Sequence, residues 1–292
     1  MRVLLLGTAA GGGVPQWNCA CANCEAVRAG TAPARTQDCL AVSADGRTWY
    51  LLNASPDIRT QLTSYAALAP LPPRESPLRG VLLTDGELDH TLGLFQLKEA
   101  AGLRVWAPAA VAATVPAREI AGRYHGWEWP RLEERFELGG LVVTVFPVSG
   151  KRPKYAGDSA LDGPWVVAYR IEDPATGGSL VYAPCVAQWP EGFDDFCAGA
   201  SCVLLDGSFF APDEMAGATA GDVGSGAQLA MGHLPMAGEH GSLARIRRSR
   251  DTRWLYTHVN NTNPVLSPAS PEHAALLEAG AELPPDATEL LL

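Results

Sequence analysis

The densest group of chemically active side chains lies in the segment LLTDGELDHTLGL, residues 82–94. Carboxylates stand at Asp85, Glu87 and Asp89, and His90 follows directly. If the chain is extended there, a spacing of two residues points all three carboxylates the same way. A helix start alone would also favour carboxylates. Three carboxylates and a histidine after an apolar run exceed what capping requires, so we expect a functional site here.

Histidines elsewhere in the chain are the candidate partners of this segment. His258 ends the apolar run RWLYTH before the polar run VNNTNP, and His233 lies in MGHLPM. Asp206 ends another apolar run, CVLLDG. Polar residues at strand ends are a common site signature in layered α/β folds, although a lone histidine there is as often a satisfied core residue. The remaining histidines lie in polar surroundings, and we expect them on the surface: His125, His240 and His273.

Three cysteines lie close together in NCACANC, at Cys19, Cys21 and Cys24. In a reducing compartment this spacing favours metal binding over disulfides. Thiolates from a tight loop are typical zinc ligands, and a structural zinc site needs a fourth ligand from elsewhere. The alternative is a loop of small buried residues. We predict a structural zinc site, and expect the other cysteines in the core: Cys39, Cys185, Cys197 and Cys202.

A glycine run, GTAAGGGVP, follows the first apolar run and raises the question of a dinucleotide site. It does not fit the G-x-G-x-x-G pattern, and Pro15 and Trp17 interrupt the helix that would hold the pyrophosphate. We therefore expect the glycines to let the backbone turn tightly or pass close to a buried site.

The elements that must position these residues are short strands and a few helices. Apolar runs bounded by Gly, Pro, Asn and Asp predict strands at 2–7, 48–54, 80–85, 103–108, 141–148, 164–172, 179–184, 202–207 and 253–258. Helical patterns that end at glycines predict helices at 90–102, 109–122 and 270–280. Early strands followed by mixed strands and helices suggest two sheets covered outside by helices.

Composition limits the classes of partner. The 292 residues carry a net charge of -10, so nucleic acid and anionic membranes are not expected partners. The opening apolar run is too short for a signal peptide, and no apolar stretch of roughly eighteen residues occurs. We expect a cytoplasmic protein with a single domain spanning residues 1–292. The sequence is compatible with a homodimer.

Taken together, the segments resemble the metallo-β-lactamase superfamily, whose signature is H-x-H-x-D-H. Within it, the sequence resembles the family of B-type proteins of pyrroloquinoline quinone (PQQ) biosynthesis. The likeness is carried, in chain order, by GTAAGGGVPQWNCACANC, LLTDGELDHTLGL, VLLDGSFF, MGHLPM and THVNNTNP. It implies an α/β fold of the metallo-β-lactamase-like αββα type, two β-sheets flanked by outer helices.

The resemblance implies a metal site made by Asp89, His90 and His258. Asp85 and Glu87 stand where two zinc-binding histidines would be. We expect these two carboxylates to serve catalysis by binding metal-bound water or a substrate amine rather than the metal.

The aspartate that bridges two metals in the superfamily has no counterpart, because the similar place reads APC at 183–185. A dizinc hydrolase centre, with ions roughly 3.5 to 4 Å apart, is therefore hard to build. Two imidazoles and one carboxylate suit non-haem iron(II), so Fe(II) is the expected active-site metal.

Two further assignments come from the resemblance alone. His233, backed by Asp206, matches a pair that handles protons beside the metal in hydrolases of the superfamily. In related phosphodiesterases a similar three-cysteine loop binds zinc with a histidine three positions after the last motif histidine. That position is Asn261 here, and asparagine is a poor zinc ligand.

The implied function is PQQ biosynthesis, through iron- and oxygen-dependent hydroxylation of the tyrosine ring of a Glu-Tyr unit cut from the precursor peptide. The partners would be this small peptide and O2. One alternative is a metallohydrolase that zinc or manganese activates, with Glu87 as general base. The other is a non-enzymatic carrier that takes PQQ or its precursor to the periplasm.

Overall fold

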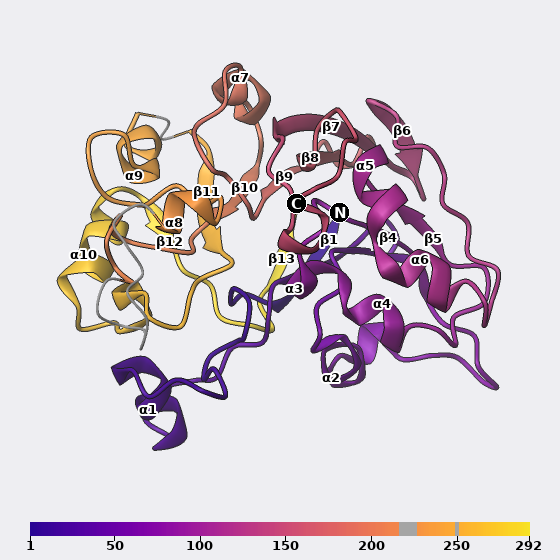
Figure 1. Ribbon diagram of the computed structural model, residues 1–292, viewed down its shortest axis with the longest axis horizontal. Helices are drawn as coiled ribbons and strands as arrows, with labels where there is room; N and C mark the ends of the chain where they lie inside the picture. The colour runs from indigo at the N-terminus through magenta and orange to yellow at the C-terminus, as the bar shows by residue number, and fades with distance from the viewer. Residues whose placement is uncertain (216–226, 249–250) are drawn as a thin grey trace.

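Two β-sheets face each other, and helices cover their outer faces (Figure 1). The computed structural model describes residues 1–215, 227–248 and 251–292. One sheet has the order β13-β1-β2-β3-β4-β5: β1 (Arg2–Gly7), β2 (Cys39–Ser43), β3 (Trp49–Leu52), β4 (Leu78–Leu82), β5 (Arg104–Trp106) and β13 (Glu289–Leu291). The other has the order β12-β11-β10-β9-β8-β7-β6: β6 (Arg135–Leu138), β7 (Leu141–Ser149), β8 (Val166–Glu172), β9 (Ser179–Ala183), β10 (Cys202–Asp206), β11 (Arg253–Thr257) and β12 (Ala281–Glu282).

The helices are short. Beside the first sheet lie α2 (Ile58–Ser64), η1 (Ala66–Leu68), α3 (Leu88–Thr91), α4 (Gly93–Gln96), α5 (Ala109–Thr114) and α6 (Pro116–Ala121). The second sheet carries α7 (Phe193–Cys197), α8 (Ala227–Ala230), α9 (Ser242–Ile246), η3 (Pro264–Leu266) and α10 (Pro271–Glu278). The others are α1 (Ala22–Arg28), which projects from the body in Figure 1, and η2 (Lys154–Ala156). No helix among the described residues has the length and apolar character that crossing a bilayer requires.

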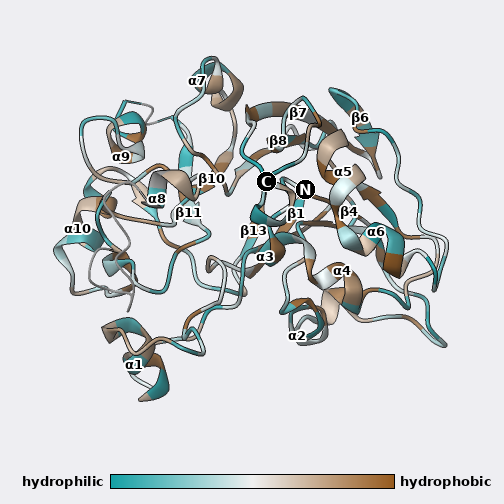
Figure 2. Cartoon of the chain, in the orientation of Figure 1, coloured by the Kyte–Doolittle hydropathy of each residue, from teal (hydrophilic) through white to brown (hydrophobic). Residues whose placement is uncertain are grey.

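The layering follows from strands that are apolar on both faces. In β1, Val3 and Leu5 belong to the core between the sheets, whereas Leu4 and Leu6 belong to the core under the outer helices. In β10, Leu204 faces the other sheet and Val203 faces the helices. Strands that are covered on both faces have continuous apolar runs in their sequences. In Figure 2 these strands are brown and the loops around them are paler or teal. The predicted αββα class is confirmed.

Each predicted strand overlaps a strand of the structure, but the single helix predicted at 90–102 is wrong. The chain forms α3 from Leu88 and then α4 up to Gln96, with a break before Gly93. The predicted helix at 109–122 is also divided, because Pro116 begins α6 after α5 has ended. At Gly93 a Cβ would lie 2.2 Å from the carbonyl oxygen of Ser55, so only glycine permits this close approach.

Parallel pairing brings the functional strand ends together. Strands β9, β10 and β11 run parallel, as do β3, β4 and β5. Parallel strands place their carboxyl ends at one edge of a sheet, where loops carry functional side chains. Asp85 follows β4, Asp206 ends β10 and His258 follows β11.

Candidate functional site

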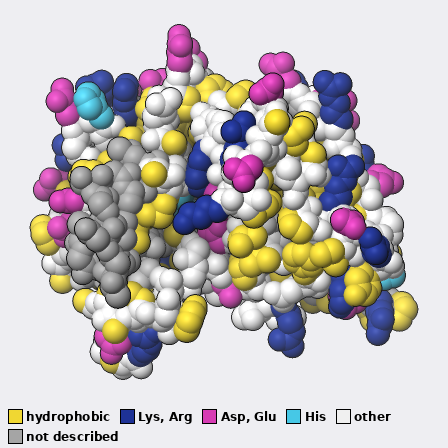
Figure 3. Space-filling view, viewed as in Figure 1, with side chains coloured by type: hydrophobic (Ala, Val, Ile, Leu, Met, Phe, Trp, Pro, Cys, Tyr) yellow, Lys and Arg dark blue, Asp and Glu magenta, His cyan; other side chains and the backbone are white. Residues whose placement is uncertain are grey.

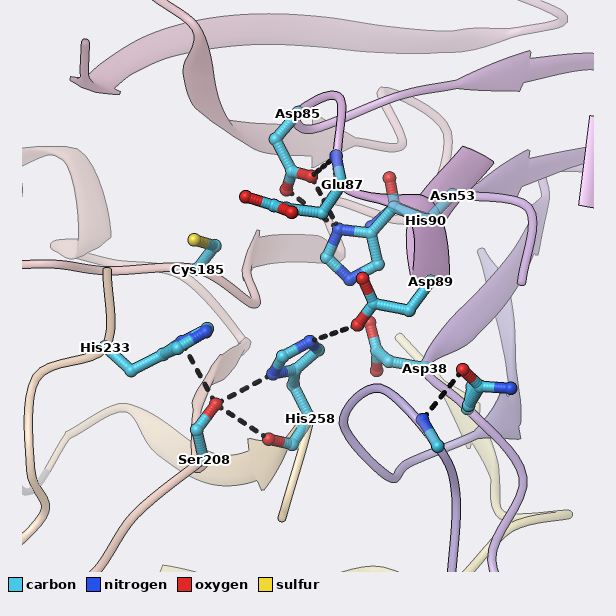
Figure 4. A network of polar contacts seen from close by, with 12 residues as sticks. Asp38, Asn53, Asp85, Glu87, Asp89, His90, Cys185, Ser208, His233 and His258 are labelled. Carbon is cyan, nitrogen blue, oxygen red and sulfur yellow. Dashed lines mark hydrogen bonds and ion pairs between the residues drawn. The ribbon is translucent and has the colours of Figure 1, made fainter. Parts of the chain in front are cut away.

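His90 is a buried histidine with one ring nitrogen engaged and the other free. Its Nδ1 lies 2.8 Å from Oδ2 and 2.9 Å from Oδ1 of Asp85 (Figure 4). A carboxylate only accepts, so Nδ1 donates to Asp85 and Nε2 is the ring nitrogen left for a ligand. Among the described residues, Nε2 of His90 is the buried side-chain nitrogen or oxygen without a hydrogen-bond partner. Such an atom calls for a ligand, because a buried unsatisfied polar group is costly.

His258 is held by Ser208 on one side and faces Asp89 on the other. Its Nδ1 lies 2.8 Å from Oγ of Ser208, and its Nε2 lies 3.1 Å from Oδ2 of Asp89 (Figure 4). The backbone of His258 has φ 54°, a left-handed conformation that non-glycine residues rarely adopt. Strain of this kind persists where the surroundings fix a side chain for function.

Asp206 anchors His233 and Ser208 at the same time. His233 Nδ1 donates to Oδ2 of Asp206 at 2.8 Å, and the Ser208 hydroxyl donates to Oδ1 at 2.8 Å. Because the single hydroxyl proton of Ser208 goes to Asp206, Nδ1 of His258 is the donor to Ser208. Without a cation, Nε2 of His258 donates to the carboxylate of Asp89, which raises the pKa of His258 although burial lowers it; once it loses its proton, Nε2 can bind a cation that sits beside Asp89. A cation between these two groups would satisfy both.

Two groups of side chains have the spacing of metal ligands, and they share His258. The ligand atoms of Asp89, His90 and His258 lie within 4.8 Å of one another, and so do those of Asp206, His233 and His258. In the second group, the Ser208 hydroxyl already contacts the Nδ1 atoms of both histidines. The first group contains the unpartnered Nε2 of His90. The geometry therefore fits a metal ion at Asp89, His90 and His258.

The charges around the site also favour a bound cation. Burial alone would raise the pKa of Asp85 and Asp89, but the adjacent His90 outweighs it and holds both values below the usual range. Burial disfavours a charged His90, yet the two carboxylates raise its pKa to about 10. The pocket thus favours positive charge, which a metal ion supplies.

The three carboxylates of residues 85–89 point to different partners, which corrects the expectation of a shared direction. Asp85 is buried behind His90, and Glu87 pairs with Lys151 at 2.6 Å. Asp89, one residue inside α3, faces His258. The segment is a turn into a helix rather than an extended strand, so the two-residue alternation does not apply.

The metal-fitting group opens into a cavity of about 650 Å³. Its walls include His233, Lys151, Phe209 and Cys185 beside the candidate ligands. The glycine run passes along it, and a Cβ at Gly11 would lie 3.1 Å from Oδ2 of Asp89. The expectation that these glycines allow a close passage at a buried site is confirmed.

Sequence reasoning did not identify Ser208, Lys151 and Asp38. Ser208 stands two positions after Asp206, in the segment VLLDGSFF, and its polar character at a strand end was the available signal. Asp38 is buried beneath the site and accepts from Thr257 and Tyr182. Burial raises the pKa of Asp38, and no local sequence pattern marks it.

The structure brings the three cysteines of the predicted zinc loop together. The sulfur atoms of Cys19, Cys21 and Cys24 lie within 4.8 Å of one another. The Asn261 side chain covers all three, with its Nδ2 atom 3.0 Å from Cys19, 3.5 Å from Cys21 and 3.4 Å from Cys24. Burial raises the pKa of Cys24 to about 11, so this thiol needs a cation nearby to become a thiolate at neutral pH. A 180° flip of the Asn261 side-chain amide would place its oxygen, in place of Nδ2, beside the three sulfur atoms.

The remaining cysteines are buried, as expected: Cys39, Cys185, Cys197 and Cys202. Cys185 also lines the cavity, at the place where the superfamily's bridging aspartate is missing. Of the histidines expected on the surface, His125 and His240 are exposed, while His273 is partly buried and bonds to the carbonyl of Val265.

Comparisons with known proteins identify the fold and the family of the chain. Residues 48–259 match the β-lactamase superfamily domain. The chain is 40% identical to the coenzyme PQQ synthesis protein B of Rhodopseudomonas palustris, with all of both chains covered. It is similar to the crystal structure of zinc-bound PqqB from Methylobacterium extorquens, with TM-score 0.92, 37% identity and full coverage of both. A diphosphatase of the PhnP family shares the fold, with TM-score 0.71, 19% identity and coverage of 100% of this chain and 97% of that one. The chain therefore belongs to the coenzyme PQQ synthesis protein B family of the β-lactamase superfamily.

Proposed function

We propose that this chain is a metal-dependent enzyme of PQQ biosynthesis that uses iron(II) and O2 to hydroxylate the tyrosine ring of a Glu-Tyr unit. The observation that carries the proposal is the unpartnered, buried Nε2 of His90 beside Asp89 and His258. Two imidazoles and one carboxylate form the set that suits non-haem iron(II) with positions open for oxygen and substrate. Iron(II) held there would supply the redox chemistry by which O2 is activated.

Family membership supports the biosynthetic role. The relatives are named for synthesis of coenzyme PQQ, and the similar protein from Methylobacterium extorquens was crystallised with zinc. Zinc has no redox chemistry, so its presence in that relative does not identify the metal that sustains turnover. Metal specificity is therefore the property to test.

His233 is the residue that we assign to proton transfer. Asp206 fixes its Nδ1, so Nε2 is the nitrogen available to a ligand in the cavity that His233 lines. A tyrosine ring is easier to oxidise when its phenol is deprotonated, and histidine is well suited to accept a proton near neutral pH. His233 would take the phenol proton, while Asp206 stabilises the resulting imidazolium.

The reaction balances with an external electron donor. One oxygen atom of O2 replaces a ring hydrogen as a hydroxyl group, so a C–H bond breaks and a C–O bond forms. The second oxygen atom leaves as water, which requires two electrons and two protons from a small reductant in solution. No reducing cofactor needs to be resident in the protein.

A hydrolase role for Glu87 has less support. Its carboxylate is 2.6 Å from Nζ of Lys151, so this ion pair already engages the group that would have to take a proton from water.

The cysteine loop has a different task in our proposal. Cys19, Cys21 and Cys24 hold one zinc ion, with Asn261 at the fourth position, and this zinc joins the loop to the segment after β11.

The test is anaerobic loading with iron(II), followed by addition of Glu-Tyr, ascorbate and ¹⁸O2. Mass spectrometry should detect one ¹⁸O atom in the peptide per turnover, and zinc-loaded protein should give none. Cleavage of the peptide by zinc- or manganese-loaded protein would favour the hydrolase instead. Unchanged peptide with every metal, despite tight binding, would favour a carrier.

A further inference from the structure

One wall of the cavity is unusually basic for an acidic protein. The chain has a net charge of -10 and only three lysines, Lys98, Lys151 and Lys154. Two of them line the cavity, together with Arg152 and Tyr155. All four lining residues come from the single segment KRPKY, residues 151–155. Figure 3 shows basic side chains at the hollow in the middle of this face.

Specific contacts hold this segment against the site. Lys151 pairs with Glu87, and the Tyr155 hydroxyl donates to the carbonyl of Gly86 at 2.9 Å. The Lys151 side chain crosses Gly232, where a Cβ would lie 2.5 Å from its Cδ atom. Arg152 packs over the ring of Trp165 at 5.8 Å. The basic wall is therefore a positioned part of the cavity.

The charges of this wall are only partly balanced. Glu87 neutralises Lys151, which is mostly buried. Arg152 and Lys154 are exposed, and neither has an ion pair with any residue that the structure describes. Two cations at the mouth of a cavity raise the local concentration of anionic ligands.

Apolar side chains stand beside the basic wall. Leu88 and Leu92 are 49% and 39% exposed, and both line the cavity with Pro56. They lie four residues apart around α3, so they share one side of that helix. Exposed leucines inside a cavity are typical of a surface that a ligand covers.

We infer that the cavity selects an acidic, aromatic peptide, whose carboxylate binds Arg152 and Lys154 while its apolar part covers Leu88 and Leu92. This inference rests on the proposed function and specifies how its substrate is recognised. Guanidinium and ammonium groups both bind carboxylates through charge-assisted hydrogen bonds. Arg152 and Lys154 act here as specificity residues, separate from the candidate metal ligands.

The test measures peptide binding without turnover. Zinc-loaded protein is titrated by calorimetry with Glu-Tyr, Gln-Tyr and Glu-Tyr amide. Arg152→Gln and Lys154→Gln should each weaken Glu-Tyr binding about tenfold, the usual scale for a hydrogen bond to a charged group. If the two cations bind the glutamate side chain, these variants should bind Gln-Tyr as the wild type does. If they bind the terminal carboxylate, the variants should bind Glu-Tyr amide as the wild type does. Leu88→Ala should weaken all three peptides about fivefold.

Matched controls come from elsewhere on the surface. Lys98→Gln removes the remaining lysine, and Leu277→Ala removes a leucine that is 55% exposed on α10; both should bind as the wild type does. The inference is overturned if the Arg152 and Lys154 variants bind Glu-Tyr normally, or weaken all three peptides equally. Charge-dependent binding without ¹⁸O incorporation by iron-loaded protein would leave this inference standing and remove the hydroxylase proposal.

Discussion

Asp85 and His90 are joined by contacts of 2.8 and 2.9 Å that fix which nitrogen of the imidazole faces the cavity. The sequence motif places Asp85 where the superfamily has a metal-binding histidine. In the structure this carboxylate lies behind a candidate ligand and orients it. A position at which the superfamily signature has a histidine thus orients a candidate metal ligand here.

This relationship predicts the behaviour of Asp85→Asn. The amide oxygen can still accept from Nδ1 of His90, but the negative charge that stabilises the metal-bound imidazole is lost. We expect iron(II) affinity to fall about 10- to 100-fold, as for other residues that support ligands. Anaerobic competition with a chelator measures it. Glu87→Gln is the matched control and should keep its affinity, since Glu87 contacts Lys151.

Ser208 should matter in a comparable way for His258. Ser208→Ala removes the oxygen that accepts from Nδ1 of His258 at 2.8 Å, and it frees the ring to turn. We expect about tenfold weaker iron(II) binding and a loss of about 1 to 3 kcal/mol of unfolding free energy from the buried groups left unsatisfied. Chelator competition and urea unfolding measure the two effects. Iron affinity equal to the wild type would show that Ser208 does not orient the ligand.

The cysteine loop offers a separate prediction. Cys21→Ser should lower both zinc content, by about one ion per chain, and thermal stability, because binding energy in such sites is partly folding energy. Elemental analysis and calorimetry of the same sample measure them. Cys39→Ser is the control: Cys39 is fully buried in the core and away from the loop, so this variant should lose stability but keep zinc. Unchanged zinc in the Cys21 variant would refute the site.

Much of the fold was predictable because its signals are local. Continuous apolar runs such as RVLLLG and CVLLDG report strands buried on both faces. Strand β2 was missed: CLAVS is short and follows a polar stretch, and its partners β1 and β3 supply its stability. The division of the 90–102 helix depends on Gly93 meeting the loop at Ser55, a tertiary contact that periodicity does not contain.

The candidate site shows the same limit. Asp89, His90 and His258 carried recognisable motifs, and the structure brings them together. The direction of Asp85 depends on a turn, and the role of Lys151 depends on an ion pair across 64 positions. Residue types can be read from a sequence, but pairings over such separations follow from the packing of the two sheets.

Asp45 provides a test of pH-dependent stability away from the site. In the turn between β2 and β3 it accepts from the backbone N–H groups of Thr48 and Arg47, at 2.7 and 2.8 Å. The first of these bonds is the main reason that the pKa of Asp45 falls from 3.8 to about 2. A lowered folded pKa stabilises the protein above pH 4, and this contribution is lost as the pH falls towards 2.

The Asp45→Asn variant isolates this contribution. Because Asp45 is exposed and screened, we expect the variant to lose about 1 kcal/mol at pH 7. The difference from the wild type should shrink towards zero between pH 4 and pH 2. Urea unfolding across this range measures it. A difference that stays constant would mean that the carboxylate charge is not responsible.

The role of His233 is the sharpest test of the proposed chemistry. Asp206 and Ser208 hold its Nδ1 at 2.8 and 3.0 Å, which leaves Nε2 for the substrate phenol. His233→Ala should keep iron(II) and Glu-Tyr binding but slow hydroxylation about a hundredfold or more, the usual cost of removing a general base. Single-turnover rates, with bound iron measured in parallel, separate the cases. Raising the pH should partly restore the variant, because solvent then deprotonates more of the phenol. A variant at full speed removes the base role, and one without iron makes His233 a ligand of the metal together with Asp206 and His258.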